Sequence, residues 1–258
     1  MSATSQNRPR SRARDGLRPQ KTAALLAQRI VGEITDGGLQ QGAPLPPEKT
    51  MLEEYGVARG TLREALRFLE IQGVITIKTG PGGGPIVNRP GSRHLASIIA
   101  MMLQLDQASF RTVLEARVVL EPELARRAAS RVTEPQAELL HQSVVRMREA
   151  LQDENAFVEE NAYFHETIAE IAGNPVFTMV LASLTWICDG TPLGVQYPMA
   201  SREAVVAEHH RIHRAIASGD VDRAGAAMSV HMGDFAAYLE AKFPQVLDAP
   251  LRWDQVDP

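Results

Sequence analysis

The stretch from Leu45 to Leu66 places the tightest constraint on how this chain can fold. It reads as a short helix, a tight turn at Gly56 and a second helix that opens with Arg59. Arg59 and Arg63 lie one turn apart on the second helix, so their side chains project from the same side. Leucines at helical spacing occupy the opposite side, which can pack against a core. Two guanidinium groups at the start of an exposed helix suit the major groove of duplex DNA.

A short β-hairpin is predicted directly after these helices. Residues 73–87 contain two short runs of β-branched residues around a glycine-rich tip, which predicts two strands joined by a turn. The tip Lys78-Thr79-Gly80 would bring a cation and bare backbone close to a groove or a phosphate. A nucleotide-binding P-loop would need Gly-Lys-Ser/Thr opening a helix, whereas Pro85-Ile86-Val87 follows here. Helix, turn, helix and hairpin together predict a winged helix-turn-helix.

One combined pattern runs through this part of the chain. Its residues are Ile30, Ile34, Leu39, Gly42, Leu45-Pro46, Glu48, Leu52, Val57, Arg59, Arg63-Glu64-Ala65-Leu66, Gly73 and Gly82-Gly83-Gly84. Over residues 22–88 the chain resembles the DNA-binding domain of the GntR family of bacterial transcription regulators. The resemblance and the hairpin tip together imply a set of DNA-contacting residues: Lys49, Arg59, Gly60, Thr61, Arg63, Lys78, Thr79 and Gly80.

Two helix starts depart from the family pattern. Members often have Ser where this chain has Pro47 and Ala58. A capping Ser contributes about 1 kcal/mol to a helix, so we expect these two helix ends to fray more or to use other caps. Pro47 is still compatible with a first helical position.

The charge is divided unevenly along the chain. The formal net charge is −4, yet residues 1–90 hold 13 of the 27 Lys and Arg residues and only 8 of the 31 Asp and Glu residues. A basic first third joined to an acidic remainder suits a module that meets phosphates tied to one that does not. The basic surplus gathers before Thr22 in a segment predicted to be disordered, which either lies along DNA or is simply solvated. No apolar run approaches the ~20 residues of a membrane span, and a single cysteine, Cys188, fits a reducing cytoplasm.

Long helical periodicities follow one another from about Leu95 onward. Helices are predicted near 95–104, 107–130, 134–153, 155–172, 175–187, 199–218 and 220–241. Short turns between helices of this length predict an antiparallel bundle. Arg117 with Glu121, Phe164-His165, Gly173-Asn174, Glu208-His209, Gly219-Asp220, Ala224, Met228 and His231 form a second pattern. With it the chain resembles the FCD-type effector domain of the FadR branch of the GntR family.

This resemblance implies a metal site. Asn161 and His165 share a helix face, and the family places them beside His209 and His231 inside the bundle. Three imidazoles and an oxygen suit Zn²⁺ or Ni²⁺. Many members have Asp where this chain has Asn161, so the site loses a negative charge. The alternative is that the histidines are hydrogen-bonded polar residues of the core.

The resemblance also implies an effector site. Arg117 is expected to hold the carboxylate of a small organic acid or sugar acid, because a guanidinium fork matches that group. The alternative is an intrahelical pair with Glu121. His213, which shares a helix face with His209, is a second candidate for the effector site or an outer hydrogen-bond partner.

The sequence therefore predicts a mostly α protein. Its expected parts are a basic disordered tail (1–18), a winged helix-turn-helix DNA-binding domain (19–88), a linker (89–94), an all-helical FCD-type domain for effector binding and dimerisation (95–243) and a C-terminal tail (244–258). We expect a cytoplasmic bacterial regulator, a repressor in most of this family, that binds a palindromic operator as a homodimer. A metal-dependent hydrolase using the histidines and a non-sensing DNA binder with a dimerisation bundle are the alternatives. Neither a His-Glu-x-x-His run nor a Gly-x-Ser-x-Gly elbow supports an enzyme.

Overall fold

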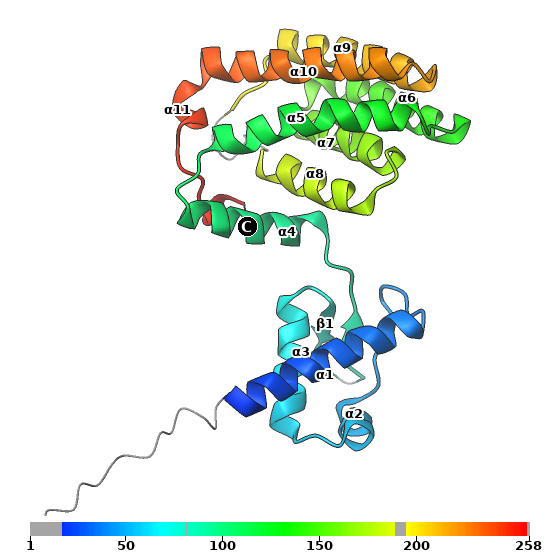
Figure 1. The fold of residues 1–258 in the computed structure, drawn as a ribbon, viewed down its shortest axis with the longest axis vertical. Coiled ribbons are helices and arrows are strands. Elements are labelled where there is room, and N and C mark those ends of the chain that lie inside the picture. Colours follow the sequence, from blue (N-terminus) through cyan, green and yellow to red (C-terminus); the bar gives the residue numbers. More distant parts are fainter. Residues whose placement is uncertain (1–16, 81, 189–194, 257–258) are drawn as a thin grey trace, which may run out of the picture. The chain divides into compact units, whose positions relative to one another are not determined.

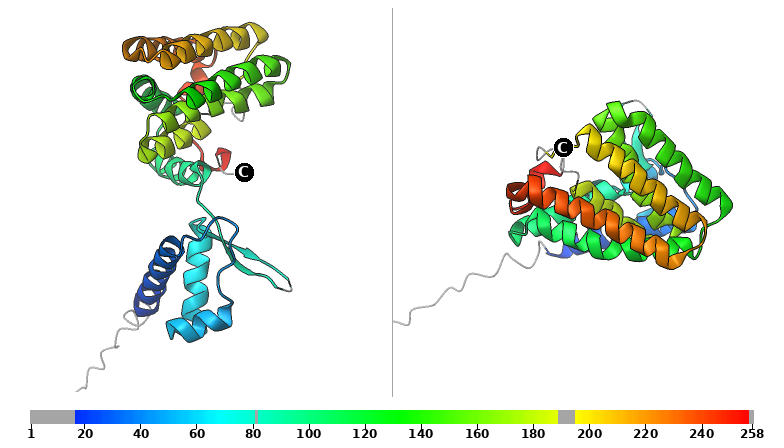
Figure 2. Two further views of the ribbon diagram at one scale, coloured as in Figure 1. Left: turned by 90° about the vertical axis from the view of Figure 1, so that its right-hand side faces the viewer. Right: turned by 90° about the horizontal axis from the view of Figure 1, so that it is seen from above.

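The computed structural model describes residues 17–80, 82–188 and 195–256. The chain divides between Pro90 and Gly91 into two compact units (Figures 1 and 2). The predicted fold class is confirmed: the protein is mostly helical, and its two strands form a small antiparallel sheet in the first unit. Among the described residues, the structure contains no helix long and apolar enough to cross a membrane.

The first unit is a winged helix-turn-helix. Its elements are α1 (Leu17–Asp36), α2 (Glu48–Tyr55), α3 (Arg59–Ile71), β1 (Ile75–Lys78) and β2 (Gly84–Val87). The strands pair antiparallel, with Ile75 opposite Val87 and Lys78 opposite Gly84. Helix α1 begins at Leu17, inside the segment predicted as a tail; the rest of that segment lies outside the described residues.

The core of this unit forms where the apolar stripes of its helices meet the wing. Ile30 of α1, Met51 of α2, Leu62 and Leu69 of α3, and Ile75 of β1 are all at most 2% exposed. Because the leucines of α3 face this core, the arginines on the opposite side of the helix face solvent.

The two atypical helix starts have backbone caps only. Pro47 and Ala58 occupy the N-cap positions of α2 and α3, and neither makes a side-chain cap hydrogen bond. Their carbonyl oxygens accept the first intrahelical bonds, from the amides of Met51 and Leu62, but the free N–H groups of each first turn gain no acceptor from the cap side chain. Between the helices, Gly56 has φ +62°, a left-handed conformation that glycine adopts without strain.

The second unit is a helical bundle. Its elements are α4 (Ser92–Leu105), α5 (Phe110–Ala129), α6 (Glu134–Glu149), the 3-10 turn η1 (Ala150–Gln152), α7 (Glu154–Ile171), α8 (Pro175–Ile187), α9 (Met199–Ala217), α10 (Val221–Lys242), α11 (Pro244–Leu247) and the 3-10 turn η3 (Trp253–Gln255). Helix α5 packs along α10 and also contacts α7, α8 and α9, while α4 lies against α8 (Figure 1). Phe110, Phe157 and Phe164 are at most 1% exposed in its core.

The end of the chain is part of this bundle. The sequence sets residues 244–258 apart as a tail, whereas Leu247, Leu251 and Val256 are buried in the bundle core. The indole Nε1 of Trp186 donates to the carbonyl oxygen of Val256 at 3.1 Å, and Ser109 forms a β-bridge with Pro250. The sequence does not predict these contacts, because the segment is short and has no strong hydrophobic periodicity. The start of α4 at Ser92 likewise shortens the predicted linker.

Candidate DNA interface and metal centre

The sequence-predicted DNA contacts lie on the open face of the first unit. Lys49 follows the start of α2, residues 59–63 open α3, and Lys78 ends β1, with Thr79 and Gly80 after it at the wing tip. All eight predicted residues are exposed except Thr61, which is half-buried. The leucines between them are buried, so folding leaves the polar face of α3 available to a groove.

A groove of about 660 Å³ separates α3 from the wing. Arg63 and Arg67 line it together with Glu48 and Glu70. Sequence reasoning missed Arg67, although its spacing of four from Arg63 continues the arginine stripe that begins at Arg59. This face thus carries a row of three guanidinium groups along one helix.

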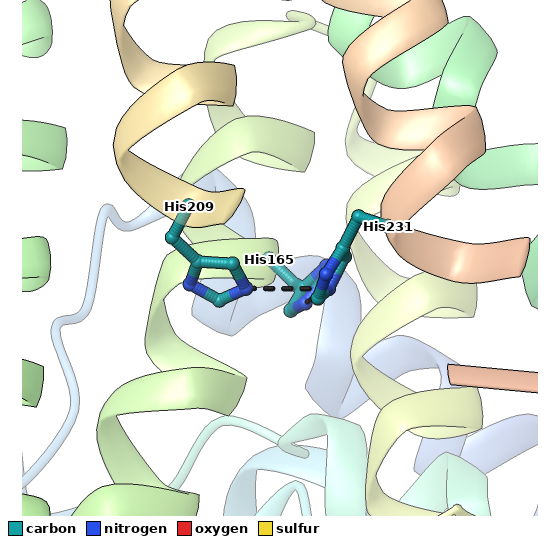
Figure 3. A group of neighbouring side chains, drawn as sticks. All are labelled: His165, His209 and His231. Atoms are coloured by element: carbon teal, nitrogen blue, oxygen red, sulfur yellow. Dashed lines mark hydrogen bonds between the residues drawn. The ribbon is translucent and has the colours of Figure 1, made fainter. Parts of the chain in front are cut away.

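Three histidines from three helices meet inside the second unit (Figure 3). His165 comes from α7, His209 from α9 and His231 from α10, and all three are at most 4% exposed. The Nε2 of His231 lies 3.3 Å from the Nε2 of His165 and 3.3 Å from the Nε2 of His209. The structure therefore gathers three of the four predicted metal ligands around one point.

Carboxylates contact the Nδ1 atoms of two of these rings. The Nδ1 of His165 contacts Oε2 of Glu121, and the Nδ1 of His231 lies 2.7 Å from Oε2 of Glu208. A carboxylate can only accept, so each Nδ1 carries the proton and, in a neutral ring, each Nε2 presents a lone pair. Carboxylate–histidine pairs of this kind orient the rings of metal-binding histidines. His209 instead stacks on Phe164 with ring centroids 4.0 Å apart, and its buried Nδ1 has no partner within the described part of the chain.

Burial favours the neutral form of two of the rings, His165 and His209. Burial lowers the pKa of His165 and, further, that of His209, and the neighbouring histidines lower both. Burial alone would raise the pKa of Glu121, but Arg117 and His165 hold it at about 2. Three Nε2 atoms, with that of His231 3.3 Å from each of the other two, fit a shared cation.

Comparison with known proteins decides the family. Residues 22–83 match the bacterial regulatory proteins of the gntR family, and residues 112–234 match the FCD domain. The HTH-type transcriptional regulator YcbG of Bacillus subtilis is 31% identical over 218 residues, which cover 84% of this chain and 90% of YcbG. The chain belongs to the GntR family. It is a transcriptional regulator with an FCD effector-binding domain.

Other relatives of this GntR protein agree. The HTH-type transcriptional repressor NanR of Cronobacter sakazakii is 27% identical over 237 residues, covering 90% of each chain. Among solved structures, Streptococcus agalactiae GntR superposes with a TM-score of 0.65 at 22% identity, covering 83% of this chain and 99% of that one. The structural likeness shows the fold, and both sequence relatives are named as HTH-type transcriptional regulators.

In this GntR protein Arg117 binds Glu121. Its Nε donates to Oε1 of Glu121 at 2.7 Å, and both side chains are almost fully buried. This is the intrahelical pair that the sequence left open as an alternative. Because the other oxygen of Glu121 contacts His165, Arg117 reaches the histidines through that carboxylate. The same guanidinium lies against Cys188, whose pKa burial raises to about 11, so this thiol stays protonated.

A pocket of about 310 Å³ lies against α7, and none of the three histidines lines it. Its lining comes mainly from α7 and the end of α8: Phe157, Val158, Glu159, Asn161, Ala162, Tyr163, Glu166, Thr185, Trp186, Cys188 and Tyr197. Asn161 therefore faces this pocket, one turn before His165 on α7. The lining holds two carboxylates and no Lys, Arg or His side chain within the described ranges. The buried Oγ1 of Thr185 has no hydrogen-bond partner there.

His213 lies apart from this pocket. It lines a separate depression with His141, Glu134 and Glu138, and its ring centroid is 5.3 Å from that of His141. Shared helix spacing with His209 suggested a common site, but the turn between them carries His213 to the α6 side of α9. Glu208 entered the sequence pattern without a role, and Glu121 only as a possible partner of Arg117. Their contacts with His231 and His165 join residues 23 and 44 positions apart.

Proposed function

We propose that this protein is a ligand-responsive repressor that binds a palindromic operator as a homodimer and senses a small carboxylate at a metal centre. The observation that carries the sensing part is the convergence of three Nε2 atoms, two of them on rings whose Nδ1 atoms contact the carboxylates of Glu121 and Glu208. Similarity to NanR, a transcriptional repressor, supports the direction of regulation. Two-fold symmetry of a dimer would be mirrored in the half-sites of the operator.

The residues present fit a divalent cation. His165, His209 and His231 would supply three nitrogen ligands, and Asn161, from the pocket side, would supply an amide oxygen. Zn²⁺ or Ni²⁺ suits this ligand set. When bound, such an ion would offer a positively charged anchor for an anionic oxygen.

The charge around the centre favours an acidic effector. Glu121 and Glu208 contribute two negative charges and Arg117 one positive charge, while Asn161 contributes none. A divalent ion would therefore leave one net positive charge in a buried region, which a single carboxylate neutralises. The small acid would bind the ion rather than Arg117 directly, because the Arg117 side chain is almost fully buried and does not line the pocket that Asn161 faces.

DNA recognition would follow from the exposed face of α3. Arg59 and Arg63 would read guanine edges in the major groove, while Lys49, Thr61 and Lys78 would mainly contact phosphates. Gly60, Thr79 and Gly80 would allow the backbone to come close to the duplex. The effector can shift DNA binding only by the difference between its affinities for the DNA-bound and free arrangements.

Two experiments test the DNA-binding part and the effector-sensing part of the proposal separately. Duplexes selected by the protein from a randomised pool should share a palindrome, and Arg59→Ala should abolish their specific retention while leaving the oligomeric state and thermal unfolding unchanged. A thermal-shift screen of organic and sugar acids should reveal stabilisers that act on metal-loaded protein and weaken operator retention. Failure to enrich any sequence would refute the proposed sequence-specific DNA binding. An absence of both metal and acid effects would leave the bundle a dimerisation scaffold.

A further inference from the structure

Glu48 forms an ion pair with one arginine of α3, the candidate recognition helix. Glu48 begins α2, and its Oε1 accepts from Nε of Arg63 on α3 at 3.1 Å. Among the described residues, no other partner of Arg63 is found, and neither Arg59 nor Arg67 on the same helix has an acidic partner. The contact therefore singles out the middle member of the arginine row.

Stability does not account for this pair. The side chains of Arg63 and Glu48 are 68% and 37% exposed, and exposed ion pairs contribute little to folding. Glu48 also puts a negative charge beside Lys49, on the face that would meet DNA phosphates. Such a charge weakens sequence-independent binding, which depends on cations meeting phosphates. Glu48 lies in the first turn of α2, where a negative charge favours the helix, and its contact with Arg63 gives it a second role to test.

The geometry of the contact suggests that role. An arginine has a flexible stem, and fixing its rotamers before binding removes part of the ordering cost. Because Glu48 takes the Nε side of the guanidinium, the two terminal nitrogens remain in a defined plane at the edge of the groove between α3 and the wing. Two parallel N–H groups in a fixed plane match O6 and N7 of guanine.

We propose that Glu48 is a positioning residue that sets the sequence specificity of Arg63, an inference that rests on the DNA-binding role assigned above. It holds the guanidinium for bidentate contact with a base and repels phosphate, so that Arg63 contributes more to specific than to non-specific complexes. Glu48 itself need not touch DNA.

The test uses the full-length protein and the duplex that it selects from a randomised pool. Affinities for this duplex and for a scrambled one are measured over a range of salt concentrations. In Glu48→Ala we expect the ratio of specific to non-specific affinity to fall about tenfold, which lies within the roughly 5- to 150-fold discrimination of a good bidentate pair. Non-specific affinity should rise about threefold, with a steeper salt dependence, because one repulsive charge is gone.

Two further variants separate charge from hydrogen bonding. Glu48→Gln removes the charge but keeps an oxygen acceptor, so it should raise non-specific affinity as Glu48→Ala does and lose less specificity. Glu53→Gln removes a charge from an exposed residue of the same helix and should leave the specificity ratio unchanged. In an Arg63→Ala background, Glu48→Ala should not alter the ratio further.

Three outcomes would overturn the proposal. In the first, Glu48→Ala leaves the specificity ratio unchanged. In the second, the effects of Glu48→Ala and Arg63→Ala on the specificity ratio are additive. In the third, specific and non-specific affinity fall in parallel and the unfolding temperature is lowered, which would indicate a structural role for Glu48. Each differs from failure of the wild-type protein to select any duplex, which would instead refute the proposed function.

Discussion

The Nε2 atoms of His165 and His231 lie 3.3 Å apart in the interior of the helical unit, and the Nδ1 atom of each ring donates to a carboxylate, that of Glu121 or Glu208. Two lone pairs facing each other at this distance repel unless a cation lies between them. A proton could serve, but burial lowers the pKa of His165. This relationship makes metal binding, rather than a hydrogen-bonded polar core, the reading that we put to the test first.

Metal content should depend on the triad and not on neighbouring histidines. We expect elemental analysis to find about one zinc or nickel ion per chain in wild-type protein and in His210→Ala, and little in His209→Ala. An ion at a thousand times its dissociation constant stabilises by about 4 kcal/mol, so a chelator should lower the unfolding midpoint of wild type and His210→Ala alone. Equal metal content in all three proteins would place the ion elsewhere.

Glu121 should link metal affinity to folding. Glu121→Gln leaves Arg117 buried without its carboxylate, and breaking a buried pair costs about 3–5 kcal/mol. Losing the carboxylate behind His165 should also weaken metal binding about 10–100-fold. Urea unfolding and metal titration measure the two effects. The matched control is Glu123→Gln, which removes an exposed partner of Arg127 on the same helix and should change stability by less than about 1 kcal/mol. Similar results for both variants would contradict this account.

Gly83 should be required for the wing. A Cβ added there would lie 2.2 Å from the carbonyl oxygen of Lys78 and 2.9 Å from that of Gly80, and backbone cannot give way as a side chain can. We expect Gly83→Ala to distort the hairpin and reduce DNA affinity, measured by fluorescence anisotropy, while metal content stays at the wild-type value. Gly32→Ala provides the comparison, since its Cβ would meet nothing within 4 Å inside α1; it should stabilise by up to about 1 kcal/mol. Undiminished DNA binding by Gly83→Ala would remove the wing from the interface.

Acid should loosen the contact between α1 and α2. The hydroxyl of Tyr55 donates to Oε2 of Glu33 at 2.6 Å, and this hydrogen bond lowers the pKa of Glu33 from 4.5. A carboxylate with a lowered folded-state pKa stabilises the fold above its ordinary pKa and loses that contribution as pH falls through the folded value. Because the pair is exposed, the effect should be below about 1 kcal/mol.

Tyr55→Phe removes the donor and provides the measurement. Urea unfolding followed by circular dichroism should show wild type more stable than this variant at neutral pH, with the difference shrinking once the pH falls below 4.5. A difference that stays constant into acid would mean that Glu33 is not the acceptor in solution.

Local sequence determined the elements of this protein and its family. Apolar residues at helical spacing, such as Ile30 and Leu62, fix which faces are buried, and Gly56 marks the turn because it adopts a positive φ. These signals act over a few residues, so they can be read along the chain. The same local spacing misled at His213, which shares a face with His209 yet lines another depression.

Tertiary structure decided which side chains meet. The bonds of His165 to Glu121, of His231 to Glu208 and of Arg63 to Glu48 join residues 44, 23 and 15 positions apart. No periodicity specifies such contacts, because they depend on how whole helices pack and on the rotamers that packing allows. Burial then sets the protonation of the histidines, a property that belongs to the folded interior and not to any stretch of sequence.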